Sequence, residues 1–106
     1  MPDSPIWSLY IVRAADKSLY TGITTDVARR FSEHAGTGPR DTSKGAKALR
    51  GKRPLILEYA CKIGNRSEAL KIEYQVKKLS KIKKEKLITG EIKLDFLMRS
   101  KARLDG

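Results

Sequence analysis

Apolar and aromatic residues gather in two short runs near the start of the chain. Residues 7–13 and 18–24 are rich in β-branched and aromatic side chains, a pattern that is typical of strands. Residues 14–17 between them are small or polar, so we predict a tight antiparallel hairpin. Gly22 lies inside the second run, where a glycine marks a bulge or the close approach of another backbone or a ligand.

Residues 27–35 have the periodicity of a short helix, for which residues 24–26 supply candidate N-cap side chains. Four positions at helical spacing share one face, and these are Val27, Arg30, Phe31 and His34. The two large apolar members must face the core, so an arginine and a histidine share the inward face, while Arg29 and Glu33 point outward. A buried guanidinium needs an anionic neighbour or a cleft. A structural ion pair, or a packed stem whose head reaches water, would satisfy the same pattern.

The remainder of the chain predicts one more strand and further helices. Residues 36–43 are turn formers and indicate a loop, whereas residues 54–61 form a continuous apolar run that predicts a third strand. Ser67 can cap a helix that runs to about residue 79, and residues 92–98 can form a final short helix that closes the core. We therefore expect an α/β (α+β) fold in which a small three-stranded antiparallel sheet has flanking helices.

Length and composition limit the class of protein. The chain has 106 residues, which is enough for one small core and one domain. No run of 18 apolar residues is present, so no membrane-spanning helix is expected, and residues 1–5 lack the features of a secretory signal. Cys61 is the single cysteine, which excludes an internal disulfide, and no Cys/His cluster suggests zinc. We expect a cytoplasmic protein.

Positive charge is concentrated in the second part of the chain. Residues 1–43 hold five basic and five acidic residues, so the formal net charge of +11 lies in residues 44–106. Five basic residues stand close together there, and these are Lys44, Lys47, Arg50, Lys52 and Arg53. Small residues between them let a phosphate backbone approach, so we predict a nucleic-acid contact. A solvated basic loop, a ribosome contact or a membrane-surface contact would give the same charge pattern.

One carboxylate interrupts the apolar stripe of the helix that is predicted to end near residue 79. The stripe is formed by Ala69, Ile72, Val76 and Leu79, and Glu73 lies within it. A carboxylate on a buried face either satisfies a buried arginine or holds a hard divalent cation at the floor of a cleft. Glu68 is a weaker candidate, since it lies in the first turn, where a carboxylate complements the helix dipole.

Three short motifs together resemble a known family. They are Leu9-Tyr10-Ile11, Tyr20-Thr21-Gly22 and Arg30-Phe31-Ser32-Glu33-His34, and their order and spacing are similar to those of the GIY-YIG nuclease superfamily. Leu9 stands where the first motif has glycine, a replacement also found in small stand-alone bacterial members and in the catalytic domain of eukaryotic structure-selective nuclease subunits. The basic stretch at residues 44–51 strengthens that likeness. The motif-bearing core spans residues 7–79, which leaves a basic helical part at 80–98 and a frayed tail at 99–106.

The resemblance implies roles for five residues. Glu73 would hold one divalent metal ion, Mg²⁺ or Mn²⁺, and Arg30 would clamp the scissile phosphate. Tyr10 and Tyr20 would orient or deprotonate the attacking water, and His34 would hydrogen-bond the phosphate or a tyrosine hydroxyl.

The sequence thus predicts a metal-dependent endonuclease that hydrolyses phosphodiester bonds in nucleic acid. We expect DNA rather than RNA as the substrate, with branched DNA or repair intermediates as candidates. We also expect a monomer without membrane contact, and we leave open whether a protein partner supplies selectivity. The alternative function is a non-catalytic nucleic-acid-binding module with a nuclease-like fold.

Overall fold

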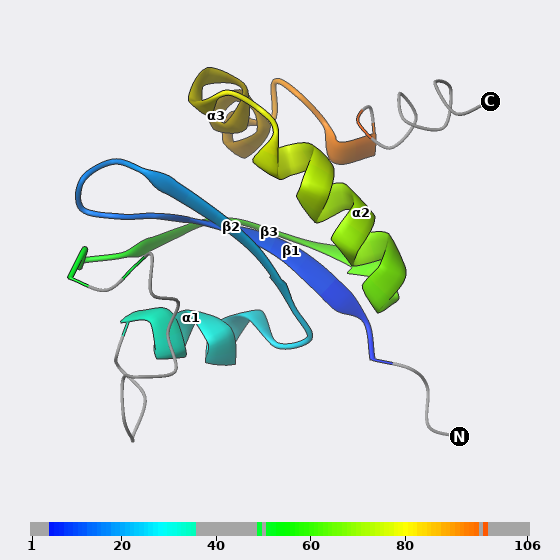
Figure 1. Cartoon of the computed structure of the whole chain (residues 1–106), viewed down its shortest axis with the longest axis horizontal. Coiled ribbons are helices and arrows are strands. Elements are labelled where there is room, and N and C mark those ends of the chain that lie inside the picture. The colour runs from blue at the N-terminus through cyan, green and yellow to red at the C-terminus, as the bar shows by residue number, and fades with distance from the viewer. Residues whose placement is uncertain (1–4, 36–48, 50, 96, 98–106) are drawn as a thin grey trace.

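The computed structural model describes residues 5–35, 49, 51–95 and 97, which form a sheet with helices on both faces (Figure 1). In chain order the elements are β1 (Trp7–Arg13), β2 (Leu19–Thr24), α1 (Val27–Ala35), β3 (Ile56–Gly64), α2 (Arg66–Lys77) and α3 (Lys81–Thr89). The three strands pair antiparallel in the order β2-β1-β3. The predicted fold class is therefore confirmed, and the first strand and the first helix have the predicted bounds.

β1 and β2 form the predicted hairpin. The Lys17 N–H donates to the Ala14 carbonyl, and the Ala14 N–H donates to the Ser18 carbonyl, each at 2.9 Å. Asp16 accepts hydrogen bonds from the Ser18 hydroxyl at 2.6 Å and from the Ser18 N–H at 3.0 Å, which lower the pKa of Asp16 to about 2. Lys17 has a φ of 75°, and the tight turn requires this left-handed conformation.

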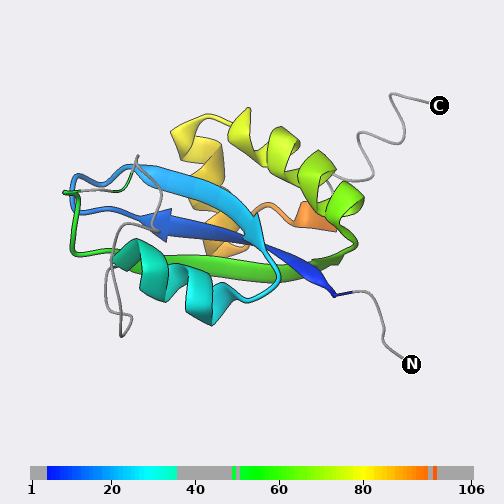
Figure 2. The same cartoon turned by 60° about the horizontal axis from the view of Figure 1, so that its bottom comes forward.

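The two faces of the sheet are covered by different helices (Figures 1 and 2). Leu9 and Ile11 of the central strand β1 pack with α2 and α3, whereas Tyr10 and Val12 face α1. Successive side chains of a strand point to opposite faces, so one strand supplies both cores. The α2/α3 core consists of Leu9, Ile11, Ile72, Val76, Leu87 and Leu94.

The third strand lies later in the chain than the sequence predicts. The apolar run covers residues 54–61, but β3 is Ile56–Gly64. Leu55 is buried in the core beneath α1 instead of pairing in the ladder. The strand continues through the exposed Lys62 because β3 is an edge strand, which can carry a solvent-facing charge.

α2 is capped by Asn65, so the prediction that Ser67 caps this helix is wrong. The Asn65 side chain accepts a hydrogen bond from the Glu68 N–H at 2.8 Å, and the Glu68 carboxylate accepts one from the Asn65 N–H at 3.0 Å. This reciprocal arrangement is a capping box, and it places Ser67 inside the first turn.

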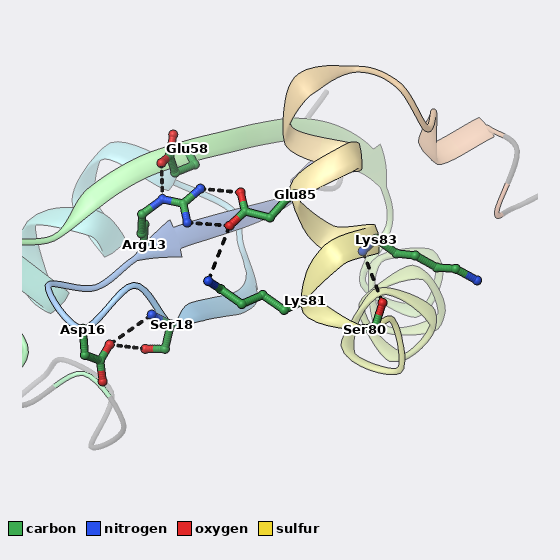
Figure 3. Close-up of polar contacts among 8 residues, drawn as sticks. All are labelled: Arg13, Asp16, Ser18, Glu58, Ser80, Lys81, Lys83 and Glu85. Carbon is green, nitrogen blue, oxygen red and sulfur yellow. Dashed lines mark hydrogen bonds and ion pairs between the residues drawn. The ribbon is translucent and has the colours of Figure 1, made fainter.

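The basic run at residues 77–86 spans a junction between two helices. α2 ends at Lys77, and the Ser80 hydroxyl caps α3 by accepting a hydrogen bond from the Lys83 N–H at 3.2 Å (Figure 3). Leu87 of α3 is 1% exposed, whereas Ile82 is 70% exposed. Only one side of α3 therefore contributes to the core.

Arg13 at the end of β1 fastens α3 to the sheet (Figure 3). Its Nε donates to Glu58 of β3 at 2.5 Å, and its Nη1 and Nη2 donate to the two carboxylate oxygens of Glu85 at 2.6 Å each. The Arg13 hydrogen bonds lower the pKa of Glu85. A fork of donors matched to a carboxylate has a defined geometry, so this pair orients α3 against β1 and β3.

The segment after α3 closes the α2/α3 core. Leu94 is 6% exposed, and Leu97 packs against the same core. These contacts agree with the predicted closing segment at residues 92–98, of which Phe96 and Met98 lie outside the described residues. Among the residues that the structure describes, no helix is both long and apolar enough to cross a membrane.

Candidate active site

Two tyrosines of the hairpin lie side by side on the α1 face of the sheet. Tyr10 is opposite Gly22 across the β1–β2 ladder and Tyr20 is opposite Val12, so the two tyrosines are diagonal neighbours. Their ring centroids are 6.3 Å apart. Tyr10 is 1% exposed, whereas Tyr20 is only partly buried, so the two residues differ in their access to solvent.

Gly22 lies beneath the ring of Tyr10. A Cβ atom at this position would be 2.6 Å from the Tyr10 Cζ atom and 3.0 Å from Cε1, which is too close for a normal contact. The glycine therefore marks a close approach, as predicted, but the approaching group is the side chain of the neighbouring strand. No bulge is needed, because the β1–β2 ladder runs without a register shift.

α1 brings His34 against both tyrosines. The helix begins at a cap in which the Asp26 carboxylate accepts a hydrogen bond from the Arg29 N–H at 3.0 Å. In the last turn, the His34 Nε2 lies 2.8 Å from the Tyr10 hydroxyl, and the ring centroids of His34 and Tyr20 are 5.3 Å apart. His34 thus contacts a tyrosine hydroxyl, which is one of the two partners that the resemblance implied.

Arg30 lies one turn before His34 and has an acidic partner on its own helix. Its Nη1 donates to the Glu33 carboxylate at 2.8 Å, so the prediction that Glu33 points away from this face is wrong. Burial by itself would lower the pKa of Arg30, but the hydrogen bond to Glu33 and the interaction with Tyr10 raise it. Arg30 therefore stays charged, and its side chain is 30% exposed.

Burial determines the charge of the Tyr10–His34 pair. Burial, together with Tyr20, raises the pKa of Tyr10 from 10.0 to about 12, although the charge and hydrogen bond of Arg30 act in the opposite direction. Burial, assisted by the Arg30 charge, lowers the pKa of His34 from 6.5 to about 4. Both groups are therefore neutral at pH 7, and Tyr10 is a poor source of phenolate.

Acidification is expected to destabilise the fold through His34, the single histidine of the chain. The unfolded chain binds a proton near pH 6.5, whereas the buried ring binds one only near pH 4. The stabilisation is therefore complete above pH 6.5 and is lost as the pH falls towards 4. We expect the free energy of unfolding to fall by about 2 kcal/mol between pH 7 and pH 5, as measured by urea denaturation. The His34→Gln variant cannot titrate, and an unchanged pH slope in that variant would contradict this assignment.

Glu73 of α2 interacts electrostatically with Tyr10. Its side chain is 17% exposed, and its Oε2 is 3.4 Å from the Lys77 Nζ. Its negative charge contributes to the raised pKa of Tyr10. α2 packs against all three strands of the sheet, and Tyr10 lies on the central strand β1. Its ion-pair partner is Lys77 of the same helix. The sequence had allowed a buried arginine as the partner of Glu73.

The described part of the chain contains no group of three His, Cys, Asp or Glu residues that could hold a metal ion. Glu73 is the single protein ligand that the resemblance implies for a metal ion. A half-buried carboxylate is a hard oxygen donor of the kind that Mg²⁺ and Mn²⁺ prefer, so the residue fits such an ion.

The basic residues singled out in the sequence separate into two groups. Lys44, Lys47 and Arg50 lie outside the described residues. Lys52 is described, and its Nζ lies 3.2 Å from the Asp16 carboxylate at the hairpin turn. Arg53 is exposed and lines a cleft. The sequence does not indicate this cleft, because its walls come from segments that are far apart in the chain.

The sequence matches the GIY-YIG catalytic domain over residues 6–86. The chain therefore belongs to the GIY-YIG catalytic domain family, which confirms the resemblance seen in its motifs.

Its relatives within the family are small bacterial proteins. The chain is 52% identical over 94 residues to the UPF0213 protein YhbQ of Salmonella arizonae, covering 89% of this chain and 88% of that protein. It is also 52% identical over 91 residues to a UPF0213 protein of Cronobacter sakazakii, covering 86% of this chain and 90% of that protein. The solution NMR structure of protein EF2693 from E. faecalis superposes with a TM-score of 0.53 at 35% identity, covering 88% of this chain and 94% of that one.

Proposed function

We propose that this protein is a metal-dependent endonuclease that hydrolyses phosphodiester bonds in nucleic acid, and in DNA rather than RNA. The observation that carries the proposal is the convergence of Tyr10, Tyr20, Arg30 and His34 on one face of the sheet, with Glu73 in electrostatic reach. Membership of the GIY-YIG catalytic domain family supports the same reaction class. The basic second part of the chain supports a polyanionic substrate.

Arg30 is the phosphate clamp in this proposal. Tyr10 and Glu33 fix its guanidinium from the protein side, and the side chain is exposed enough to present donors to a substrate. A guanidinium offers forked donors that match two phosphate oxygens. Because the group is positioned before the substrate binds, it can stabilise the negative charge that builds on phosphorus without reorganising.

Tyr20 is the tyrosine that meets the attacking water. Its side chain is partly exposed, whereas Tyr10 is buried, bonded to His34 and held neutral by its raised pKa. The Tyr20 hydroxyl accepts a hydrogen bond from water and orients the water oxygen towards phosphorus. Tyr10 and His34 are positioning residues, which support the Tyr20 ring and the Arg30 guanidinium.

Glu73 would hold the divalent ion, with water and phosphate oxygens as the other ligands. When bound, Mg²⁺ or Mn²⁺ would polarise the phosphate and stabilise the departing oxygen. Lys77 lies beside the carboxylate, and this ion pair orients the Glu73 side chain in the absence of the ion.

We infer further that the chain acts as a monomeric single domain. Its sheet and helices form two cores that share β1, which supports one cooperative unit. Branched DNA or repair intermediates would be selected by their shape, or with a protein partner, since the described elements are all used to build the sheet and its helical layers.

A cleavage assay tests this proposal. Labelled single-stranded, duplex, flap and four-way-junction DNA would be incubated with the protein and Mg²⁺ or Mn²⁺, and in parallel with a chelator. We expect cutting that requires the metal and that Glu73→Gln slows by roughly 10²-fold, because an amide oxygen is a weaker ligand than a carboxylate. Metal-independent cutting, or cutting that survives the substitution, would contradict the proposal. Salt-sensitive binding without any cutting would instead support the non-catalytic binding module.

A further inference from the structure

A cleft of about 480 Å³ lies beside the candidate active site. It is lined by Phe31, Ala35, Arg53, Pro54 and Leu55, and we call it the Phe31–Arg53 cleft. We propose that this cleft binds one unpaired nucleobase of the strand whose phosphate is held by Arg30. The inference rests on the proposed function, and it names the class of substrate: nucleic acid with an unpaired nucleotide at or next to the cut.

The cleft and the phosphate clamp lie on the same helix. Phe31 follows Arg30 directly and Ala35 follows His34, so α1 supplies one wall of the cleft and two residues of the site. The opposite wall comes from the segment that leads into β3, which lies beside the C-terminal end of α1 (Figures 1 and 2). A nucleotide carries its phosphate and its base on two sides of one sugar, so a donor and an apolar wall at neighbouring helix positions suit a single nucleotide.

The lining has the chemistry that recognises a base. Phe31 offers an aromatic face, and Arg53 offers a planar guanidinium at the rim, and both kinds of group stack on unpaired bases. Leu55 is buried and closes the floor, whereas Arg53 and Pro54 are exposed. The lining of the cleft is therefore mostly apolar and includes one exposed cationic side chain.

Size and charge select among ligands. The volume is in the lower part of the range for small-molecule sites, roughly 300–1,000 Å³, which is enough space for one nucleobase. Arg53 brings a positive charge to the lining, which favours a ligand with a phosphate over an uncharged peptide. A base that is paired within a duplex would have to leave the stack before it could enter.

Binding measured without cleavage tests this inference. A fluorescent single-stranded oligonucleotide would be titrated with the protein in the presence of a chelator, and the Phe31→Leu variant would be compared with the parent. Leucine keeps the apolar contact of Phe31 with the core but removes the aromatic face, so we expect roughly tenfold weaker binding. Duplex of the same sequence should bind both proteins equally. Ile82→Ala changes an exposed apolar residue on the other side of the sheet and should bind like the parent.

A substrate with a missing base gives a test that does not depend on protein folding. An abasic position would be moved along the oligonucleotide, and at one position the loss of the base should weaken binding to the parent but not to Phe31→Leu. Arg53→Gln, a change at an exposed residue, should weaken binding at that position as well. Equal binding by Phe31→Leu and the parent, or an equal effect of the abasic position in both, would overturn the inference. If binding follows the inference and no DNA is cut, the cleft stands and the nuclease proposal fails. If DNA is cut but binding does not follow the inference, the nuclease proposal stands and only the role of the cleft is rejected.

Discussion

Replacing Arg30 by alanine is expected to slow DNA cleavage by about 10³-fold and to leave the fold intact. The loss follows from the geometry, because Arg30 is the cation that Tyr10 and Glu33 hold on the exposed side of the site. Without it, the charge that develops on phosphorus loses this prepositioned donor fork. Single-turnover cleavage with saturating protein measures the chemical step, so that weaker substrate binding does not distort the result.

Two variants make the Arg30 experiment specific. Arg29→Ala removes the same charge from the exposed side of the same helix and should keep nearly all activity. Arg30→Lys keeps the charge but loses the planar fork, so its rate should fall between those of the parent and Arg30→Ala. The melting temperature of Arg30→Ala should stay within roughly 4 °C of the parent, because its ion pair with Glu33 is partly exposed. Comparable losses in Arg29→Ala and Arg30→Ala would show a general charge effect and contradict the role of a clamp.

The elements that the sequence predicts best are those with a purely local cause. Residues 7–13 and 27–35 carry their strand and helix patterns within themselves, and both have the predicted bounds. The third strand begins later than predicted, because Leu55 belongs to the apolar run but packs in the core under α1. This packing depends on tertiary contacts, which the periodicity of the sequence does not show. The cap of α2 depends on a reciprocal bond between Asn65 and Glu68, and Ser67 is an equally good cap by residue type.

The candidate site was predictable as a set of residues but not as an arrangement. The motifs place tyrosine, arginine and histidine on a hairpin and a helix, but only the antiparallel register shows that Tyr10 is opposite Gly22. Helical periodicity alone assigns Glu33 to the outer face, whereas its flexible side chain reaches back to Arg30 along the helix. Which tyrosine is exposed depends on how α1 packs, and no sequence pattern reports that.

The charged partners of the sheet illustrate the same limit. Arg13 is one basic residue among many in the sequence, and nothing local distinguishes it from the solvated ones. In the fold it bonds to Glu58 and Glu85, which come from β3 and α3 (Figure 3). Pairs that are so distant in the chain arise from topology, so they become visible only when the strand order is known.

Gly22→Ala is expected to damage both stability and cleavage, although the substitution adds a single methyl group. The new Cβ would be 2.6 Å from the Tyr10 Cζ, so the ring must move. Tyr10 is 1% exposed and its hydroxyl is bonded to His34, so the ring has no open space to enter. We expect a loss of about 1–3 kcal/mol in the free energy of unfolding, as for other overpacked cores. Cleavage should fall by about 10²-fold, because displacement of the ring also shifts Arg30 and Tyr20.

A double-mutant cycle separates the ring contact from a general effect on the strand. In a Tyr10→Leu background the ring that meets the new Cβ is absent, so Gly22→Ala should cost little further stability in urea denaturation. The coupling between the two changes would then nearly equal the cost of Gly22→Ala alone. The same displacement should open His34 to water, move its pKa back towards 6.5 and flatten the loss of stability between pH 7 and pH 5. If Gly22→Ala were equally costly in both backgrounds and the pH slope stayed steep, β2 itself would require glycine, and the ring of Tyr10 would not be the reason for it.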